Sequence, residues 1–273
     1  RSSAASDVYK RQHLHTDAAL SALENGKMVI CEKPIALSSR KAKEVVNAFE
    51  KKGMPFYPAH CIRFWPAYVK AREIIIKKQF GKVLGAFFTR LSPTPSWAKN
   101  NWINSPDLSG SAVVDLHIHD ADFITYTFGM PDCVSAFTGG LNKNLSEHII
   151  TIYKYKKFPD CLITADNGWL SAKGFHFTMG FRIELEEVTL LFGHLPYLDK
   201  LVVHNREGKT YSIKIDSRDG YFHELTHFIS CARAGKNSPI IPPMDAVKTM
   251  HVIETELKSA KKHGKLLKTH WQT

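Results

Sequence analysis

The chain has 273 residues, of which 44% are hydrophobic and 23% charged, with a formal net charge of +11. This length allows one large domain or two modest ones, and the composition is that of a globular enzyme. No apolar stretch approaches the length of a membrane span, and the lysines are scattered in pairs without a nucleic-acid-binding motif. We therefore expect neither a membrane nor a nucleic acid as a partner.

The cysteines are odd in number, and no two of them have Cys-x-x-Cys spacing. Free thiols in a reducing compartment explain this pattern better than disulfides or a zinc ribbon. We therefore expect a cytoplasmic protein without a metal site.

Helices and strands alternate in the first part of the chain. Helices are predicted over 16–25 and 38–53, and buried strands over 28–31 and 54–59. Thr16 is the expected N-cap of the first helix, because its hydroxyl can accept a backbone hydrogen bond. Short links between alternating helices and strands predict parallel strands with right-handed crossovers.

The sequence Glu32-Lys33-Pro34 follows the first predicted strand directly. In open α/β sheets, ligands bind beyond the carboxyl ends of the strands, where Lys33 is well placed to meet one. Pro34 restricts Lys33 to an extended backbone. The alternative is an ordinary lysine in a loop.

A helix over 66–79 and a strand over 83–91 come next. The polar loop after them carries Trp97 and Trp102. Two interpretations stay open for this pair, because tryptophan either stacks on the face of a sugar ring or anchors a loop by its own burial.

The segment 109–128 is predicted to contain a helix that follows Gly110 and has an apolar stripe along one side. Asp115, His119 and Asp122 fall at i, i+4 and i+7, so they share a neighbouring face. A carboxylate one turn before an imidazole can handle protons, because the carboxylate stabilises the charged ring. A solvated polar face is the alternative. Gly110 precedes this helix, where an unusual backbone would need glycine.

The remainder reads as many short strands followed by two helices, over 221–232 and 244–263. Successive strands with hairpin-like links predict an antiparallel sheet. The predicted strands are 134–138, 148–155, 161–165, 175–184, 188–192, 201–204 and 211–215.

Five motifs in sequence order resemble those of the Gfo/Idh/MocA family, which includes glucose–fructose oxidoreductase and inositol dehydrogenase. They are Ala-Leu…Gly-Lys-x-Val-x-x-Glu-Lys-Pro at 19–34, Arg-Phe-x-Pro at 63–66, Asp-x-x-x-His-x-x-Asp at 115–122, Tyr-x-x-Glu-Leu-x-x-Phe at 221–228 and Ser-Ala-x-x-x-Gly-Lys at 259–265. One departure is Ser109-Gly110-Ser111, where the family often has three glycines. Since serine is small, we expect little consequence.

The resemblance implies a fold and an activity. The fold class is α/β plus α+β: a Rossmann-type parallel sheet over 1–61, then a domain over 62–273 with a mostly antiparallel open sheet flanked by helices. The family moves a hydride between NAD or NADP and a hydroxyl-bearing carbon of a sugar, cyclitol or related polyol. It also implies a homo-oligomer joined through the open face of the sheet.

The resemblance also implies roles for individual residues. Lys33, Asp115 and His119 are the expected catalytic residues. The expected cofactor contacts are His15, Glu32, Lys33 and Pro34, and the expected substrate contacts are Arg63, Trp97, Trp102 and Asp122.

A dinucleotide site of this kind needs a strand, a Gly-x-Gly-x-x-Gly turn and a helix, yet no Gly-x-Gly occurs in the chain. We therefore expect an N-terminally truncated family member in which residues 1–12 are a non-native segment and NAD(P)H affinity is millimolar or absent.

Two other function classes stay open. One is a non-catalytic binding or oligomerising protein without a cofactor site. The other is a metal-dependent hydrolase that uses His117 and His119, which would share one face only on a strand.

Overall fold

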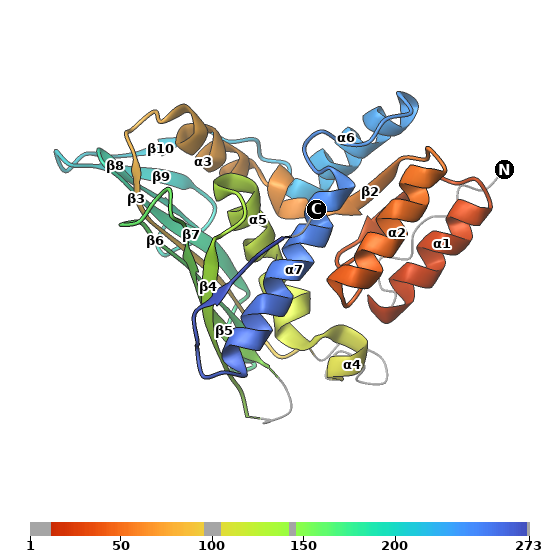
Figure 1. Cartoon of the computed structure of the whole chain (residues 1–273). Coiled ribbons are helices and arrows are strands. Elements are labelled where there is room, and N and C mark those ends of the chain that lie inside the picture. The colour runs from red at the N-terminus through yellow and green to blue at the C-terminus, as the bar shows by residue number, and fades with distance from the viewer. Residues whose placement is uncertain (1–11, 96–104, 142–145, 272–273) are drawn as a thin grey trace.

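The computed structural model describes residues 12–95, 105–141 and 146–271. The first part of the chain forms a small parallel sheet with two helices beside it (Figure 1). Strand β1 (Val29–Glu32) pairs in parallel with β2 (Phe56–Ala59) over their full lengths. A short 3-10 turn, η1 (Gln12–Leu14), leads into helix α1 (His15–Glu24), and α2 (Ser39–Lys51) connects the two strands. The predicted parallel arrangement is confirmed.

Helix α2 forms as its sequence predicts. The Ser38 side chain accepts a hydrogen bond from the backbone N–H of Lys41, at 3.3 Å, and so caps the helix. The side chains of the predicted apolar stripe are all buried against the rest of the small sheet: Ala42, Val45, Val46 and Phe49.

The predicted N-cap of α1 is wrong. The helix begins at His15, directly after the η1 turn, and no side chain caps it. Thr16 lies inside the helix, and its hydroxyl donates to the carbonyl of Ile35 at 3.5 Å. Because η1 already turns the chain in the helical sense, the helix begins before Thr16 and leaves its hydroxyl free to contact another segment.

In the part of the chain that the structure describes, one large mixed sheet holds nine strands in the order β10-β9-β8-β7-β3-β6-β5-β4-β11. The pairing of β3 with β6 is parallel, and every other neighbouring pair is antiparallel. The strands are β3 (Val83–Pro93), β4 (Cys133–Gly139), β5 (His148–Lys154), β6 (Leu162–Ser171), β7 (Thr178–Leu185), β8 (Val188–Phe192), β9 (Leu201–Asn205), β10 (Thr210–Ile213) and β11 (Leu267–Lys268).

Helices cover one face of this sheet (Figure 1). A 3-10 turn, η2 (Cys61–Phe64), leads from β2 into α3 (Pro66–Lys77), which starts with proline at its first position. Side chains of α3 and of the helix α5 (Ile118–Phe128) pack against those of the sheet. The Tyr68 ring of α3, for example, makes edge-to-face contacts with Phe123 of α5 and with Phe181 of β7. The opposite face of the sheet carries exposed apolar side chains, which are described below.

The helix predicted to follow Gly110 is present, but it begins with a π-helical turn. The structure has a short helix, α4 (Pro106–Ser109), then a turn at Gly110 and Ser111 with φ of +68° and +65°. A π-helical turn, η4 (Val113–His117), follows and runs into α5 (Ile118–Phe128). Two successive positive φ values reverse the chain, which ends α4. A positive φ is strained for serine, and in this conformation the N–H of Ser111 donates to the Ser109 hydroxyl at 3.0 Å.

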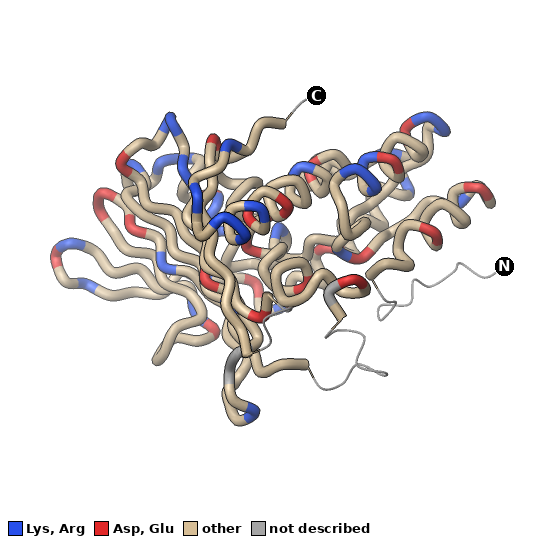
Figure 2. The backbone as a smooth tube through the Cα atoms, turned by 60° about the horizontal axis from the view of Figure 1, so that its bottom comes forward, with Lys and Arg blue, Asp and Glu red and all other residues tan. Residues whose placement is uncertain are grey.

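Two further helices complete the fold. Asp219 caps α6 (Gly220–Arg233) by accepting from the N–H of Phe222 at 2.8 Å. Helix α7 (Pro243–Ala260) packs between α2, α5 and β4, and so joins the small sheet to the large one. None of the helices in the described ranges is long and apolar enough to cross a membrane. Figure 2 shows basic and acidic segments interspersed along the helices and hairpins.

Candidate functional site

The end of β1 meets the η4 turn through a lysine. The Lys33 ammonium donates to the backbone carbonyl of Asp115 and, at 3.1 Å, to its Oδ1 atom. Both side chains are mostly buried. Lys33 and Asp115, two of the three predicted catalytic residues, come from segments far apart in the chain, and the fold places them in direct contact.

Asp115 has a second partner that the sequence did not indicate. The Gln12 side chain donates to the same Oδ1 atom at 2.6 Å, and Gln12 is only 4% exposed. Gln12 lies in the segment 1–12, which was expected to be non-native because it shows no periodicity. A lone buried amide carries no periodic signal, so only the tertiary structure identifies it.

His119 lies one helical turn beyond Asp115, at the start of α5. Burial holds the pKa of its imidazole well below the usual value, and the positive charges of Lys33 and Arg90 lower it further. The Nδ1 atom of the ring is buried without a hydrogen-bond partner. His119 is therefore neutral at pH 7, with one buried ring nitrogen that has no hydrogen-bond partner.

His15 lies beside the Glu32-Lys33-Pro34 segment. Its Nδ1 atom lies 2.8 Å from the carbonyl oxygen of Pro34, a distance at which the ring N–H donates. Burial raises the pKa of Glu32, and the neighbouring Lys33 charge opposes that rise. All four residues predicted to contact the cofactor thus gather at the end of β1.

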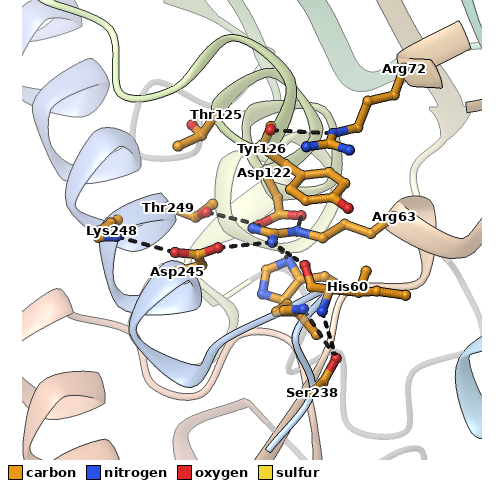
Figure 3. A network of polar contacts seen from close by, with 12 residues as sticks. His60, Arg63, Arg72, Asp122, Thr125, Tyr126, Ser238, Asp245, Lys248 and Thr249 are labelled. Carbon is orange, nitrogen blue, oxygen red and sulfur yellow. Dashed lines mark hydrogen bonds and ion pairs between the residues drawn. The ribbon is translucent and has the colours of Figure 1, made fainter. Parts of the chain in front are cut away.

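Arg63 and Asp122, both predicted to contact the substrate, bind each other (Figure 3). The guanidinium donates from Nε and Nη2 to the two carboxylate oxygens, at 2.8 Å each, in a bidentate pair. Its Nη1 atom donates to Asp245 at 3.0 Å and to the Ile240 carbonyl at 2.9 Å. Both side chains are buried, so their polar atoms are engaged within the protein.

Further groups complete this network (Figure 3). The Tyr126 ring lies between two guanidinium groups, with Arg63 at 4.3 Å and Arg72 at 3.7 Å from its centroid. Thr249 donates to Asp122 at 2.9 Å. Burial alone would raise the pKa of Asp122, but the Arg63 charge outweighs it and the pKa is lowered. The network joins η2, α5 and α7.

His117 belongs to a second buried network. Its Nδ1 atom lies 2.5 Å from Asn167 Oδ1 and its Nε2 atom 2.9 Å from Glu256 Oε2. Asn167 in turn donates to Asp120 at 2.6 Å, and Arg90 pairs with Asp120 at 2.9 Å. Burial favours neutral His117, but the Glu256 charge outweighs it and raises the pKa.

The hydrolase alternative needs His117 and His119 on one metal. In the structure both ring nitrogens of His117 are engaged in its network, and His119 lies next to Lys33's charge. Within the described ranges, no group of three His, Cys, Asp or Glu side chains is arranged to hold a metal ion. The geometry therefore gives this alternative no support.

Two pockets lie on the molecule beside α6, with volumes of about 680 and 480 Å³. Trp65 and Met179 help to line the first, and Arg63 and Tyr126 the second. Lys33 and His119 line neither of them. Trp97 and Trp102 lie outside the described residues, so their predicted contacts stay predictions.

Comparisons with known proteins follow the two parts of the fold. Residues 4–60 match a family model described as "Oxidoreductase family, NAD-binding Rossmann fold". Residues 68–189 match one described as "GFO/IDH/MocA C-terminal domain". The first match begins at residue 4, so the resemblance starts earlier than the sequence analysis predicted.

Curated relatives are similar over part of their length. An uncharacterized oxidoreductase of Streptococcus pneumoniae is 31% identical over 50% of this chain and 37% of its own length. The NAD-dependent scyllo-inositol 2-dehydrogenase of Bacillus subtilis is 26% identical over 87% of this chain and 70% of its own length. The chain thus spans little more than a third of the first relatives it matches.

Solved structures show the same fold at low identity. Levoglucosan dehydrogenase, in complex with NADH and levoglucosan, superposes with a TM-score of 0.82 at 19% identity. The superposition covers 97% of this chain and 79% of that one. The predicted fold class agrees with this likeness.

Proposed function

Because this chain belongs to the Gfo/Idh/MocA family of oxidoreductases, we propose that its protein moves a hydride between NAD or NADP and a hydroxyl-bearing carbon of a sugar, cyclitol or related polyol. The proposal concerns the whole protein, since the chain spans only part of its first relatives. The substrate class is supported by the names of relatives that act on scyllo-inositol and levoglucosan.

The observation that carries the proposal is the contact between Lys33 and Asp115. It brings a cation at the end of a parallel strand onto the helical segment that carries His119. An ammonium group has three donors, and two of them are directed at Asp115. The third is available to a substrate oxygen, where it would stabilise developing alkoxide charge.

His119 is the proposed general base. Its neutral ring takes the proton of the substrate hydroxyl when the substrate is oxidised. Asp115 acts through Lys33, which it orients, and is therefore a positioning residue. In this proposal Arg63 and Asp122 hold α5 against η2, and thus keep His119 in a fixed position relative to Lys33.

The residues at the end of β1 fit the nicotinamide end of the cofactor. When bound, NAD or NADP supplies the hydride acceptor or donor, and the protein supplies orientation and proton transfer. Glu32 and Pro34 shape this side, with the Pro34 carbonyl fixed by His15. Trp97 and Trp102 remain proposed contacts to the sugar ring.

We also propose a cytoplasmic location and a homo-oligomer joined through the open face of the sheet. Free thiols at all five cysteines support a reducing compartment. Exposed apolar side chains on the open face of β4 and β5 support the oligomer.

The experiment compares Lys33→Ala and His119→Ala in the whole protein, with scyllo-inositol and levoglucosan as first substrates. Each substitution should lower turnover by about 10²-fold or more, the usual scale for a general acid–base group. His148→Ala is the matched control, because His148 lies partly exposed on the large sheet. NADH affinity, measured by calorimetry, should stay near that of the unsubstituted protein. Unchanged turnover in both variants would refute the assigned roles.

A further inference from the structure

Helix α6 carries a glutamate on its buried face. Gly220, Glu224 and Phe228 recur at i, i+4 and i+8, and all three are buried. Glu224 itself is only 2% exposed. An apolar residue would suit this position better, because an ionised carboxylate loses its hydration there. The Tyr-x-x-Glu-Leu-x-x-Phe motif thus contains a side chain that the proposed mechanism does not use.

The start of α6 is packed tightly against η2. A Cβ atom on Gly220 would lie 2.7 Å from the backbone oxygen of Cys61 and 2.7 Å from the Trp65 ring. Only glycine fits there, so the approach of α6 to η2 is fixed. Glu224, one turn later on the same face, is therefore held beside the segment that directly follows β2.

The acidic groups around Glu224 locate it at the strand ends. The charges of Glu32, at the end of β1, and of Asp122, on α5, both act on its carboxyl. Cys61 of η2 and Tyr221 of α6 are the other titratable groups that interact with it. Glu224 thus lies where ligands of open α/β sheets bind, beyond the carboxyl ends of β1 and β2.

The carboxyl of Glu224 has an unused hydrogen-bonding atom. Its Oε1 atom is buried without a hydrogen-bond partner. Burial raises the pKa of Glu224 to about 9, and the charges of Glu32 and Asp122 contribute. The group is therefore a neutral carboxylic acid at pH 7, which carries one O–H donor and retains acceptor capacity.

We propose that Glu224 is a ligand-binding residue at these strand ends, which pairs through its O–H and C=O with a primary carboxamide, the group on the nicotinamide ring. A carboxamide presents one acceptor and two donors in a plane, so both atoms of a neutral carboxyl find a partner. Glu32 and Pro34, assigned above to the nicotinamide end, end the neighbouring strand. The assignment rests on the proposed function.

The first test needs no cofactor. Glu224→Gln keeps the shape and the hydrogen-bonding groups but cannot titrate. Between the ordinary pKa of 4.5 and about 9, the folded protein holds a proton that the unfolded chain has lost. The stability of the unsubstituted protein therefore falls as pH rises through this window, relative to the variant.

The measurement is urea unfolding of both proteins from pH 5 to 9. The ratio of their unfolding constants should rise by up to about tenfold per pH unit and level off above pH 9. A constant ratio would show that Glu224 is already ionised at neutral pH and would overturn the inference.

The second test, made on the whole protein, is binding of NADH and of its 3-acetylpyridine analogue, in which an acetyl group replaces the carboxamide. Glu224→Leu should weaken NADH binding by about tenfold or more, the effect of one good hydrogen bond. It should leave the analogue less affected, and Glu224→Gln should bind NADH nearly normally. Equal losses for both dinucleotides, or no loss, would overturn the assignment while leaving the proposed function in place. Failure of the unsubstituted protein to bind NADH would overturn both.

Discussion

Arg63 is the residue on which the arrangement of the site most depends. It lies in η2, at the end of the small sheet, and its guanidinium reaches Asp122 of α5 and Asp245 of α7. A paired buried charge is tolerated, but removal of one partner leaves the other without compensation.

We predict that Arg63→Met destabilises the protein by about 3–5 kcal/mol at pH 7, because Asp122 stays buried without its cation. Urea unfolding measures this loss of stability. The double variant Arg63→Met/Asp122→Asn should recover part of the lost stability, because it also removes the buried charge of Asp122. Arg72→Met is the control, since Arg72 contacts the same Tyr126 ring from a partly exposed position.

The pH dependence of this variant follows from Asp122. Its folded pKa is lowered, so the stability that it contributes is present above its ordinary pKa of 3.8 and is lost as pH falls through the folded value. The difference in free energy of unfolding between Arg63→Met and the unsubstituted protein should therefore become smaller as the pH is lowered. A difference in free energy of unfolding that stays constant down to pH 3 would contradict the role of the ion pair.

At this scale the sequence predicts which residues gather, but not which atoms they face. The motifs placed Lys33, Asp115, Arg63 and Asp122 at one site, and the structure brings them to the same region. Spacing along a helix could not show that Asp122 faces an arginine of another segment, because that contact depends on the tertiary packing. The same holds for Gln12 and its bond to Asp115.

At the scale of elements, the turn at Gly110 and Ser111 sets the position of Asp115, one of the residues of the proposed site. Gly110 has a φ of +68°, and a Cβ atom there would lie 2.4 Å from Cγ2 of Val114. Val114 belongs to the same π-helical turn as Asp115. A larger residue at 110 must therefore displace the turn that holds Lys33.

We predict that Gly110→Ala is more costly than Gly26→Ala. Gly26 has a similar φ of +65°, but open space surrounds its Cβ position. Gly26→Ala should cost about 1–2 kcal/mol of strain, whereas Gly110→Ala adds an overpacking cost of about 1–3 kcal/mol. Only Gly110→Ala should also reduce turnover. Thermal unfolding and steady-state rates test this, and equal costs for the two variants would refute it.

Periodicity predicts most elements and misses the irregular ones. Helix α2 and the strands of the large sheet follow repeats of 3.6 and 2, which burial on one face enforces. The η4 turn departs from the helical repeat, and the paired positive φ values before it involve a serine. No propensity rule predicts such features, because tertiary contacts around Gly110 and Asp115 hold them in place.

At the scale of the whole molecule, the open face of the large sheet is the proposed interface between subunits. Phe137 and Ile150 lie directly opposite each other on β4 and β5, and Ile150 is 46% exposed. Adjacent exposed apolar side chains on a sheet are a surface that association would cover.

We predict that Ile150→Glu disrupts the oligomer and leaves the fold intact. A buried charge opposes association, whereas an exposed one costs little in the monomer. Ile229→Glu is the matched control, because Ile229 is 48% exposed on α6. Light scattering after size-exclusion chromatography gives the mass of each variant. Dissociation by Ile229→Glu, with Ile150→Glu unchanged, would place the interface elsewhere.

The sequence also predicted the order of the two sheets, but not the parallel pairing in the larger one. The alternation of apolar and polar residues along β3 and β6 indicates that each strand has one buried face. It does not indicate which strand lies beside it, or whether the pairing is parallel. That pairing has a kinetic consequence. It matches Gly85 with Leu162, so the chain between them must close into a long loop before the strands meet.

The β4–β5 hairpin is local and can form early, whereas β3 gains β6 only after that loop has closed. The loop contains η4 and α5, and with them Asp115 and His119. We therefore expect the catalytic arrangement to be among the last features acquired during folding. A nascent or partly refolded molecule would then contain much of its secondary structure while still lacking the contact between Lys33 and Asp115.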